Sequence, residues 1–269
     1  MPQPQCSLTR EEVRRVDQLV MERLGVPGLL LMENAGRQVA DAVVALLREQ
    51  AAAAGSVVVV AGGGNNGGDG FVCARHLLVR GVPCVMILLQ PPESYIGDAA
   101  ANLRFLQALR GAGILPAQRG MGVPPMCLEG VSPSQTLDSR QNMPVAAERE
   151  RDALETHGRD AHATLWDAHA TLLRGASVIV DAIGGTGVVG PLRPALAAAV
   201  TACNDAGRPI VAVDIPTGLD CDTGRPVGGP CIRAFRTVTF VAKKRGFDNP
   251  ASREFTGEVF IADIGVPEM

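Results

Sequence analysis

The chain has 269 residues and is 46% hydrophobic but only 3% aromatic, so it can bury a large core made mostly of Ala, Val, Leu and Ile. The net charge of −3 gives no support for nucleic-acid binding, and we expect no membrane span because no 18-residue apolar segment is free of glycine and charge. The polar start at residues 1–5 does not favour a signal peptide, and seven cysteines without a C-x-x-C pair favour neither a disulfide framework nor a zinc site. We therefore expect a cytoplasmic protein.

The chain is expected to open with two helices. Thr9 and Glu12 form a capping-box pattern, and apolar residues follow at helical spacing up to Leu24. A second helix should span about residues 29–49. Glu33 and Asn34 lie inside it, and two interpretations stay open, an exposed helix face or a turn near a functional site.

A glycine-rich segment follows the first predicted strand. Residues 56–60 read as a buried parallel strand because Val57–Val60 are all β-branched. Residues 61–70 read as a loop of glycines and asparagines before a helix that resumes at Phe71. A strand, a glycine-rich turn and a helix are typical of phosphate binding, although a tight turn without a ligand has the same pattern. Gln90 stands where a dehydrogenase needs an acidic residue, and no Lys–Ser/Thr pair marks a P-loop.

Two further predicted strands, residues 176–180 and 209–213, lead into aspartates, Asp181 and Asp214. Alternation of strands and helices predicts a Rossmann-like three-layer α/β/α sandwich with a mostly parallel sheet. In such a sheet the strand ends share one edge, where ligands bind. We therefore expect polar side chains to converge there, although each aspartate taken alone could equally be a helix cap or turn residue. The converging side chains are Asn65, Asn66, Asp69, Asp181 and Asp214.

We expect a single domain over residues 1–269 that carries a surface insertion at about 117–160. This segment is rich in Pro, Gly, Ser and Gln, which favours a surface excursion or a linker. His157, His162 and His169 lie at its end or just after it, but their spacing matches no strong metal signature.

Several motifs in this order resemble the NAD(P)H-hydrate epimerase family, the YjeF N-terminal domain. The resemblance runs from about Thr9 to Pro267 and is interrupted by the insertion. It rests on residues 32–36, 65–70, 97–103, 181–182, 214–218, 237–240, 257–259 and 262–265.

The resemblance implies an isomerase that interconverts the R and S forms of hydrated NADH and NADPH at carbon 6 of the nicotinamide ring. This inversion needs an acid, a base and negative charge facing a developing cation. Asp214 suits all three roles, although it could instead only hydrogen-bond substrate hydroxyls. The family's substrate-binding positions correspond to Asn65, Asn66, Gly67, Gly68, Asp69, Gly185, Thr186, Gly187, Val188, Val189, Gly190, Pro191 and Asp214.

The resemblance also implies a potassium ion, K+, held by Asn66, Asp181 and Thr217. Their amide, carboxylate and hydroxyl oxygens suit a hard cation. Gly184 replaces a more usual Phe of the family and Gly63 a more usual Pro, which affects the nicotinamide end of the site. Lys244 matches a family lysine but could equally be a surface charge.

Two other functions compete with the epimerase. A non-catalytic member of the fold could bind a nucleotide or a protein partner, whereas Gln90 disfavours an NAD-dependent oxidoreductase. Because the chain ends at Met269, we expect it to lack the dehydratase domain to which some relatives are fused, and to depend on a separate dehydratase. A homodimer is among the assemblies that the sequence allows.

Overall fold

The computed structural model describes residues 7–50, 56–111 and 169–266. Its centre is a six-stranded sheet with the order β2-β1-β3-β4-β5-β6, and every neighbouring pair is parallel. The expected α/β sandwich is confirmed, with a sheet that is parallel throughout. The strands are β1 (Val57–Ala61), β2 (Cys84–Leu88), β3 (Val178–Ala182), β4 (Ile210–Val213), β5 (Arg236–Phe240) and β6 (Glu258–Ala262).

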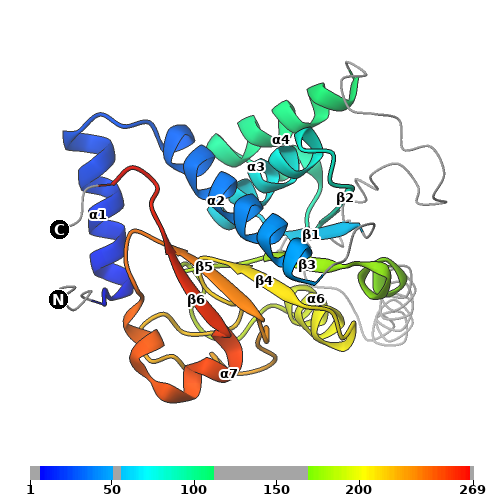
Figure 1. Ribbon diagram of the computed structural model, residues 1–269. Coiled ribbons are helices and arrows are strands. Elements are labelled where there is room, and N and C mark those ends of the chain that lie inside the picture. Colours follow the sequence, from blue (N-terminus) through cyan, green and yellow to red (C-terminus); the bar gives the residue numbers. More distant parts are fainter. Residues whose placement is uncertain (1–6, 51–55, 112–168, 267–269) are drawn as a thin grey trace, which may run out of the picture.

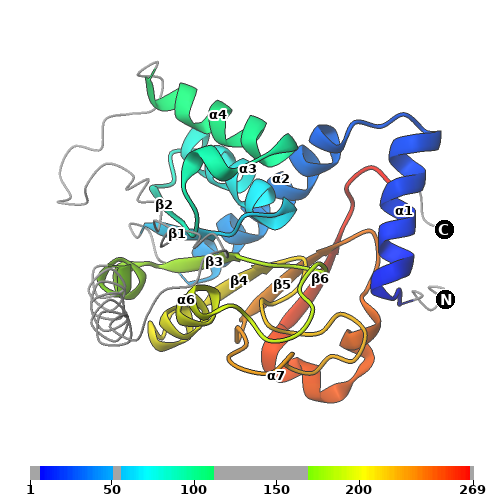
Figure 2. The same cartoon turned by 180° about the vertical axis from the view of Figure 1, so that it is seen from behind.

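Two hydrophobic layers pack on the two faces of the sheet, because side chains alternate along each strand. Val57 and Val59 of β1 face one cluster, and Val58 and Val60 face the other. Figures 1 and 2 show α2, α3 and α4 over one face and α6 over the other. The long helices are α1 (Arg10–Arg23), α2 (Gly28–Glu49), α3 (Asn65–Val79), α4 (Gly97–Gly111) and α6 (Pro194–Asp205).

Short elements complete the described part of the chain. Residues 169–175 are helical, and Leu173 packs with α6 in the second cluster. Between β5 and β6 the chain forms the short helices η2 (Arg245–Asp248), η3 (Pro250–Ser252) and α7 (Arg253–Thr256), and η1 (Pro92–Ser94) precedes α4. None of the helices in the described ranges is long and apolar enough to cross a bilayer.

The capping box at the start of α1 is present. Thr9 Oγ1 accepts a hydrogen bond from the Glu12 backbone N–H, and the Thr9 N–H donates to the Glu12 carboxylate at 2.7 Å. Leu8 forms a parallel bridge with Lys244, which joins the chain before α1 to the segment after β5. The expected insertion, with His157 and His162, falls outside the described residues.

The expected loop over residues 61–70 is wrong in its second half. Helix α3 begins at Asn65, so the asparagines and the following glycines form its first turns, and only residues 62–64 connect it to β1. The glycines allow this tight packing. A Cβ on Gly67 would lie 2.0 Å from the backbone oxygen of Gly62, and one on Gly70 would lie 2.6 Å from the Ala182 Cβ.

Candidate active site

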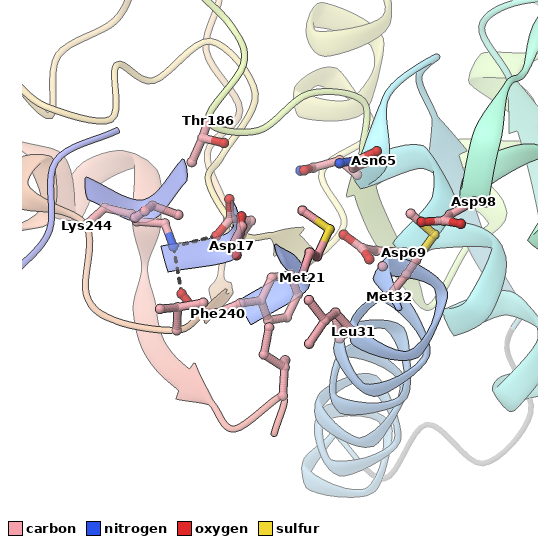
Figure 3. A pocket seen from close by; sticks show the side chains of 17 residues that line it. Asp17, Met21, Leu31, Met32, Asn65, Asp69, Asp98, Thr186, Phe240 and Lys244 are labelled. Atoms are coloured by element: carbon pink, nitrogen blue, oxygen red, sulfur yellow. Dashed lines mark hydrogen bonds and ion pairs between the residues drawn. The ribbon is translucent and has the colours of Figure 1, made fainter. Parts of the chain in front are cut away.

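A cavity of about 170 Å³ lies beyond the carboxyl ends of the central strands. It is bounded by α1, α2 and α3, and by the segments that follow β3, β4 and β5 (Figure 3). This is the edge at which parallel α/β sheets bind their ligands. The lining residues are Val13, Asp17, Met21, Gly28, Leu31, Met32, Ala35, Asn65, Asn66, Asp69, Asp98, Thr186, Asp214, Phe240, Val241, Lys244 and Ile264.

Asp214 follows β4 directly and is held by a buried lysine. Its Oδ1 lies 2.8 Å from the Lys244 Nζ and accepts a hydrogen bond from Thr239 Oγ1 at 3.1 Å. The Lys244 side chain is 1% exposed, and its ammonium also donates to the Phe240 carbonyl at 2.8 Å. The alternative of Lys244 as a surface charge is therefore wrong. Asp214 and Lys244 thus form a buried ion pair in the cavity wall.

The backbone of Asp214 has a φ of +64°. This left-handed conformation is uncommon for residues other than glycine, and Asp and Asn tolerate it better than most. The Asp214 N–H donates to the Val238 carbonyl at 2.8 Å, which ties the turn to β5. In this turn Asp214 lines the cavity.

Asp69, one turn into α3, is 7% exposed and lines the same cavity. Burial raises the pKa of its carboxyl well above the usual value, and the nearby carboxylates of Asp214 and Asp17 raise it further. The cavity therefore contains carboxyl groups in different surroundings, one beside an ammonium and one without a cation of its own.

Asp17 is a cavity residue that the sequence analysis missed. It lies on α1 in the same stripe as Val13, Val16 and Val20, which are buried. Burial raises the pKa of Asp17, whereas the Lys244 ammonium lowers it. A carboxylate inside an otherwise apolar stripe was the sequence signal that could have identified it.

Asp181, Thr217 and Asn66 form a second polar cluster behind the cavity. Asp181 is fully buried within β3, and it accepts hydrogen bonds from the Thr217 N–H at 2.8 Å and from Thr217 Oγ1 at 2.7 Å. Burial raises its pKa to about 6, although these hydrogen bonds oppose the shift. Asn66 Nδ2 donates to the Val213 carbonyl at 2.7 Å, so its amide oxygen points elsewhere, toward Gly185.

This cluster fits a monovalent cation. It offers a carboxylate, an amide oxygen and a hydroxyl, and none of the ion pairs formed within the described ranges involves Asp181. A buried carboxylate without a cationic partner is costly, and a bound cation would remove that cost. By contrast, the described residues contain no group of three His, Cys, Asp or Glu side chains that could hold a metal ion.

The structure brings some predicted substrate-binding residues to the cavity and not others. Those that line it are Asn65, Asn66, Asp69, Thr186 and Asp214. Gly67 and Gly68 are not among the lining residues. A Cβ on Gly67 would meet the Gly62 backbone, and one on Gly68 would meet Met32, which itself lines the cavity. In the 185–191 loop, the other six residues lie outside the cavity wall.

The two α2 residues whose alternatives were left open lie differently relative to the cavity. Glu33 pairs with Arg75 and with His76 on α3, so it joins two helices and does not line the cavity. Asn34 Nδ2 donates to the carbonyl of Ile264, a cavity residue, at 2.8 Å.

Arg10 at the start of α1 donates to the Val188 carbonyl at 3.2 Å and pairs with Asp220 at 2.8 Å, which ties the 185–191 loop to α1.

Together, these features define a parallel α/β domain whose cavity is lined by four carboxyl groups and one buried ammonium. Comparison with known proteins identifies its family. The model of the YjeF-related protein N-terminus matches residues 28–119 and 117–246. The chain belongs to this family.

The relatives include both short and long proteins. The chain is 34% identical to the NAD(P)H-hydrate epimerase of Rhodopirellula baltica, with 97% of this chain and 84% of that protein covered. It is 35% identical to the NAD(P)H-hydrate epimerase of Pirellula staleyi, covering 96% of this chain and 92% of that protein. It is also 35% identical to the bifunctional NAD(P)H-hydrate repair enzyme Nnr of Moorella thermoacetica over 97% of this chain, but it spans only 41% of that protein.

A solved structure has the same fold. The crystal structure of the yeast protein ynu0 superposes with a TM-score of 0.63 at 23% identity, covering 95% of this chain and 87% of that chain. This likeness supports the parallel sheet and its helical layers.

Proposed function

We propose that this protein is an NAD(P)H-hydrate epimerase, an isomerase that interconverts the R and S forms of hydrated NADH or NADPH at carbon 6 of the nicotinamide ring. The observation that carries the proposal is the Asp214 carboxylate, which faces the cavity with the Lys244 ammonium 2.8 Å away. The two stand-alone epimerases support it, because the match covers most of each protein.

The chemistry at carbon 6 explains why a carboxylate is needed. Carbon 6 carries a hydroxyl beside the ring nitrogen, so loss of that oxygen forms an iminium cation. An ionised Asp214 stabilises this cation electrostatically and can accept a proton from the water that returns. Asn65 and Thr186 lie on the cavity wall, where they can hydrogen-bond the substrate.

The family's substrate positions that do not line the cavity are assigned a supporting role in this proposal. Gly67 and Gly68 place the first turn of α3, and the loop formed by Gly185, Gly187, Val188, Val189, Gly190 and Pro191 borders the substrate beyond Thr186. The backbone N–H groups at the start of α3 suit an anionic part of the substrate, because a helix N-terminus attracts negative charge.

K+ is the proposed bound ion, and Asn66, Asp181 and Thr217 would hold it. When bound, the ion supplies positive charge beside the substrate. The chain's own contribution is to bring three segments together at one point, because these residues come from α3, β3 and the turn after β4. A homodimer and a separate dehydratase that consumes the product stay predictions.

The proposal is tested by adding the purified protein to (R)-NADHX and separating the two epimers by chromatography over time, with the spontaneous interconversion subtracted. The wild type should accelerate the interconversion. Asp214→Asn keeps the size of the side chain but not its charge, so turnover should fall by about 10²–10⁴-fold while substrate affinity changes much less. Asp205→Asn, at an exposed position on α6, is the matched control.

A wild type that binds NADHX without accelerating its interconversion would favour the non-catalytic alternative. Near-normal turnover of Asp214→Asn would move the catalytic role to another residue.

A further inference from the structure

The carboxyl group of Asp69 has no partner in the part of the chain that the structure describes. It is 7% exposed, lines the cavity, and forms no hydrogen bond or ion pair with a described residue. Buried carboxylates normally have hydrogen-bond donors or cations beside them, because an ionised group without them is strongly destabilised. The side chain is therefore arranged for something that enters the cavity.

Asp69 and Asp214 face the cavity in opposite electrostatic surroundings. Asp214 contacts the Lys244 ammonium and the Thr239 hydroxyl, whereas Asp69 has neither kind of contact. Figure 3 shows Asp69 on the α3 side of the cavity and Lys244, which holds Asp214, on the other side. Two carboxyl groups whose surroundings differ in this way are typical of an acid and base pair.

The carboxylates nearest Asp69 favour its neutral form, and the ammonium of the cavity wall is engaged by other groups. Asp17 faces the cavity from α1 and Asp214 from the end of β4, and both carboxylates raise the pKa of Asp69 in addition to burial. Asp98 at the start of α4 also lines the cavity, and Cys73 lies one turn further along α3. Lys244 is the cation of the cavity wall, and its ammonium is occupied by Asp214 and the Phe240 carbonyl.

We propose that Asp69 is a second catalytic residue, which gives its proton to the oxygen that leaves carbon 6, while Asp214 takes the proton of the water that returns. This inference rests on the proposed epimerase function. It divides between two residues the acid and base roles that the sequence analysis gave to Asp214 alone.

The proton and bond changes balance in two steps. First, the carbon 6–oxygen bond breaks, the oxygen takes the Asp69 proton and leaves as water, and the lone pair of the ring nitrogen forms the iminium. Second, a water molecule adds to the opposite face of carbon 6 and loses a proton to Asp214. The turnover ends with Asp69 ionised and Asp214 protonated, which is the state that processes the opposite epimer, and proton exchange with solvent restores the first state.

The test compares Asp69→Asn, Asp69→Glu and Asp17→Asn with wild type in the NADHX epimer assay across pH. We expect Asp69→Asn to lower turnover by about 10²–10⁴-fold with little change in KM, and Asp69→Glu to keep more turnover because a carboxyl remains. In wild type the rate should fall as pH rises through the raised pKa of Asp69, because only the neutral carboxyl can donate. Asp69→Asn should lose this fall.

A second readout does not depend on activity. A carboxyl that is neutral in the folded protein but ionised in the unfolded chain makes wild type less stable as pH rises above about 4. The Tm of Asp69→Asn should therefore rise relative to wild type between pH 4 and pH 8, whereas the exposed control Asp205→Asn should show no such trend.

The outcomes separate the two proposals. If wild type is active and Asp69→Asn has near-normal turnover, this inference is overturned and the epimerase function stands. The same holds if the fall in rate at high pH is lost in Asp17→Asn but kept in Asp69→Asn. A difference in Tm that does not depend on pH overturns it as well, because Asp69 would then be ionised in the folded protein. A wild type that does not accelerate the interconversion overturns both.

Discussion

The pair formed by Lys244 and Asp214 allows a prediction about stability. The Lys244 side chain is 1% exposed and that of Asp214 10%, so Lys244→Met would leave a carboxylate in the cavity wall without its cation. Removing one partner of a buried ion pair costs about 3–5 kcal/mol of unfolding free energy. The Phe240 carbonyl, which accepts from the same ammonium, would also lose its donor.

Lys243 provides a matched control in the neighbouring position. It pairs with Asp248 at 2.6 Å, but its side chain is 34% exposed, and exposed pairs contribute about 0–1 kcal/mol. The double variant Lys244→Met/Asp214→Asn should be more stable than Lys244→Met alone, because no unpaired charge remains.

Urea unfolding at pH 7 measures these differences as changes in the midpoint at constant m-value. Equal and small losses for Lys244→Met and Lys243→Met would refute the reasoning, since they would mean that Asp214 is solvated or neutral without its lysine.

Two further predictions concern the glycines of α3 and the cation cluster. Gly67→Ala places a Cβ 2.0 Å from the Gly62 backbone oxygen and should lower the free energy of unfolding by about 1–3 kcal/mol. Gly64→Ala, whose Cβ meets nothing within 4 Å, should have a much smaller effect. Equal melting temperatures for the two variants would contradict this. The pKa of Asp181 is raised to about 6, so the carboxylate that would bind K+ is mostly protonated at pH 5 and ionised at pH 7.5. Added KCl should therefore raise the Tm more at pH 7.5 than at pH 5, relative to choline chloride, and Asp181→Asn should remove the difference; a pH-independent effect of KCl would count against the site.

Sequence patterns predicted β1, β3 and β4 well because each is a short buried run of mostly β-branched and aliphatic residues. Strand β1 was expected over residues 56–60 and spans Val57–Ala61. The start of α1 was predicted correctly, since a capping box is local chemistry between Thr9 and Glu12.

The start of α3 was predicted wrongly because local propensity opposes it. Three glycines in the first six residues disfavour a helix by up to about 1 kcal/mol each. Tertiary packing overrides this cost, since Gly67 and Gly70 let α3 approach β1 and β3 more closely than any side chain would allow.

Asp17, which sequence analysis missed, and Lys244, for which it left two alternatives open, depend on contacts between distant segments. Lys244 lies between two other basic residues, which is typical of a surface segment, and only its position beside Asp214 explains its burial. Asp17 lies 52 positions before Asp69 in the chain, so no local pattern connects the two.

The left-handed backbone of Asp214 has a consequence for how its substitutions should be interpreted. A β-branched or bulky residue at a φ of +64° would be strained by roughly 1–2 kcal/mol, and alanine shares part of that strain. A scan that replaced Asp214 by alanine would combine a distorted turn with a lost carboxylate and would overstate the chemical role of the side chain. Asparagine shares the tolerance of aspartate for this conformation, which makes it the substitution that isolates charge from backbone shape, and glycine the one that isolates the loss of the whole side chain.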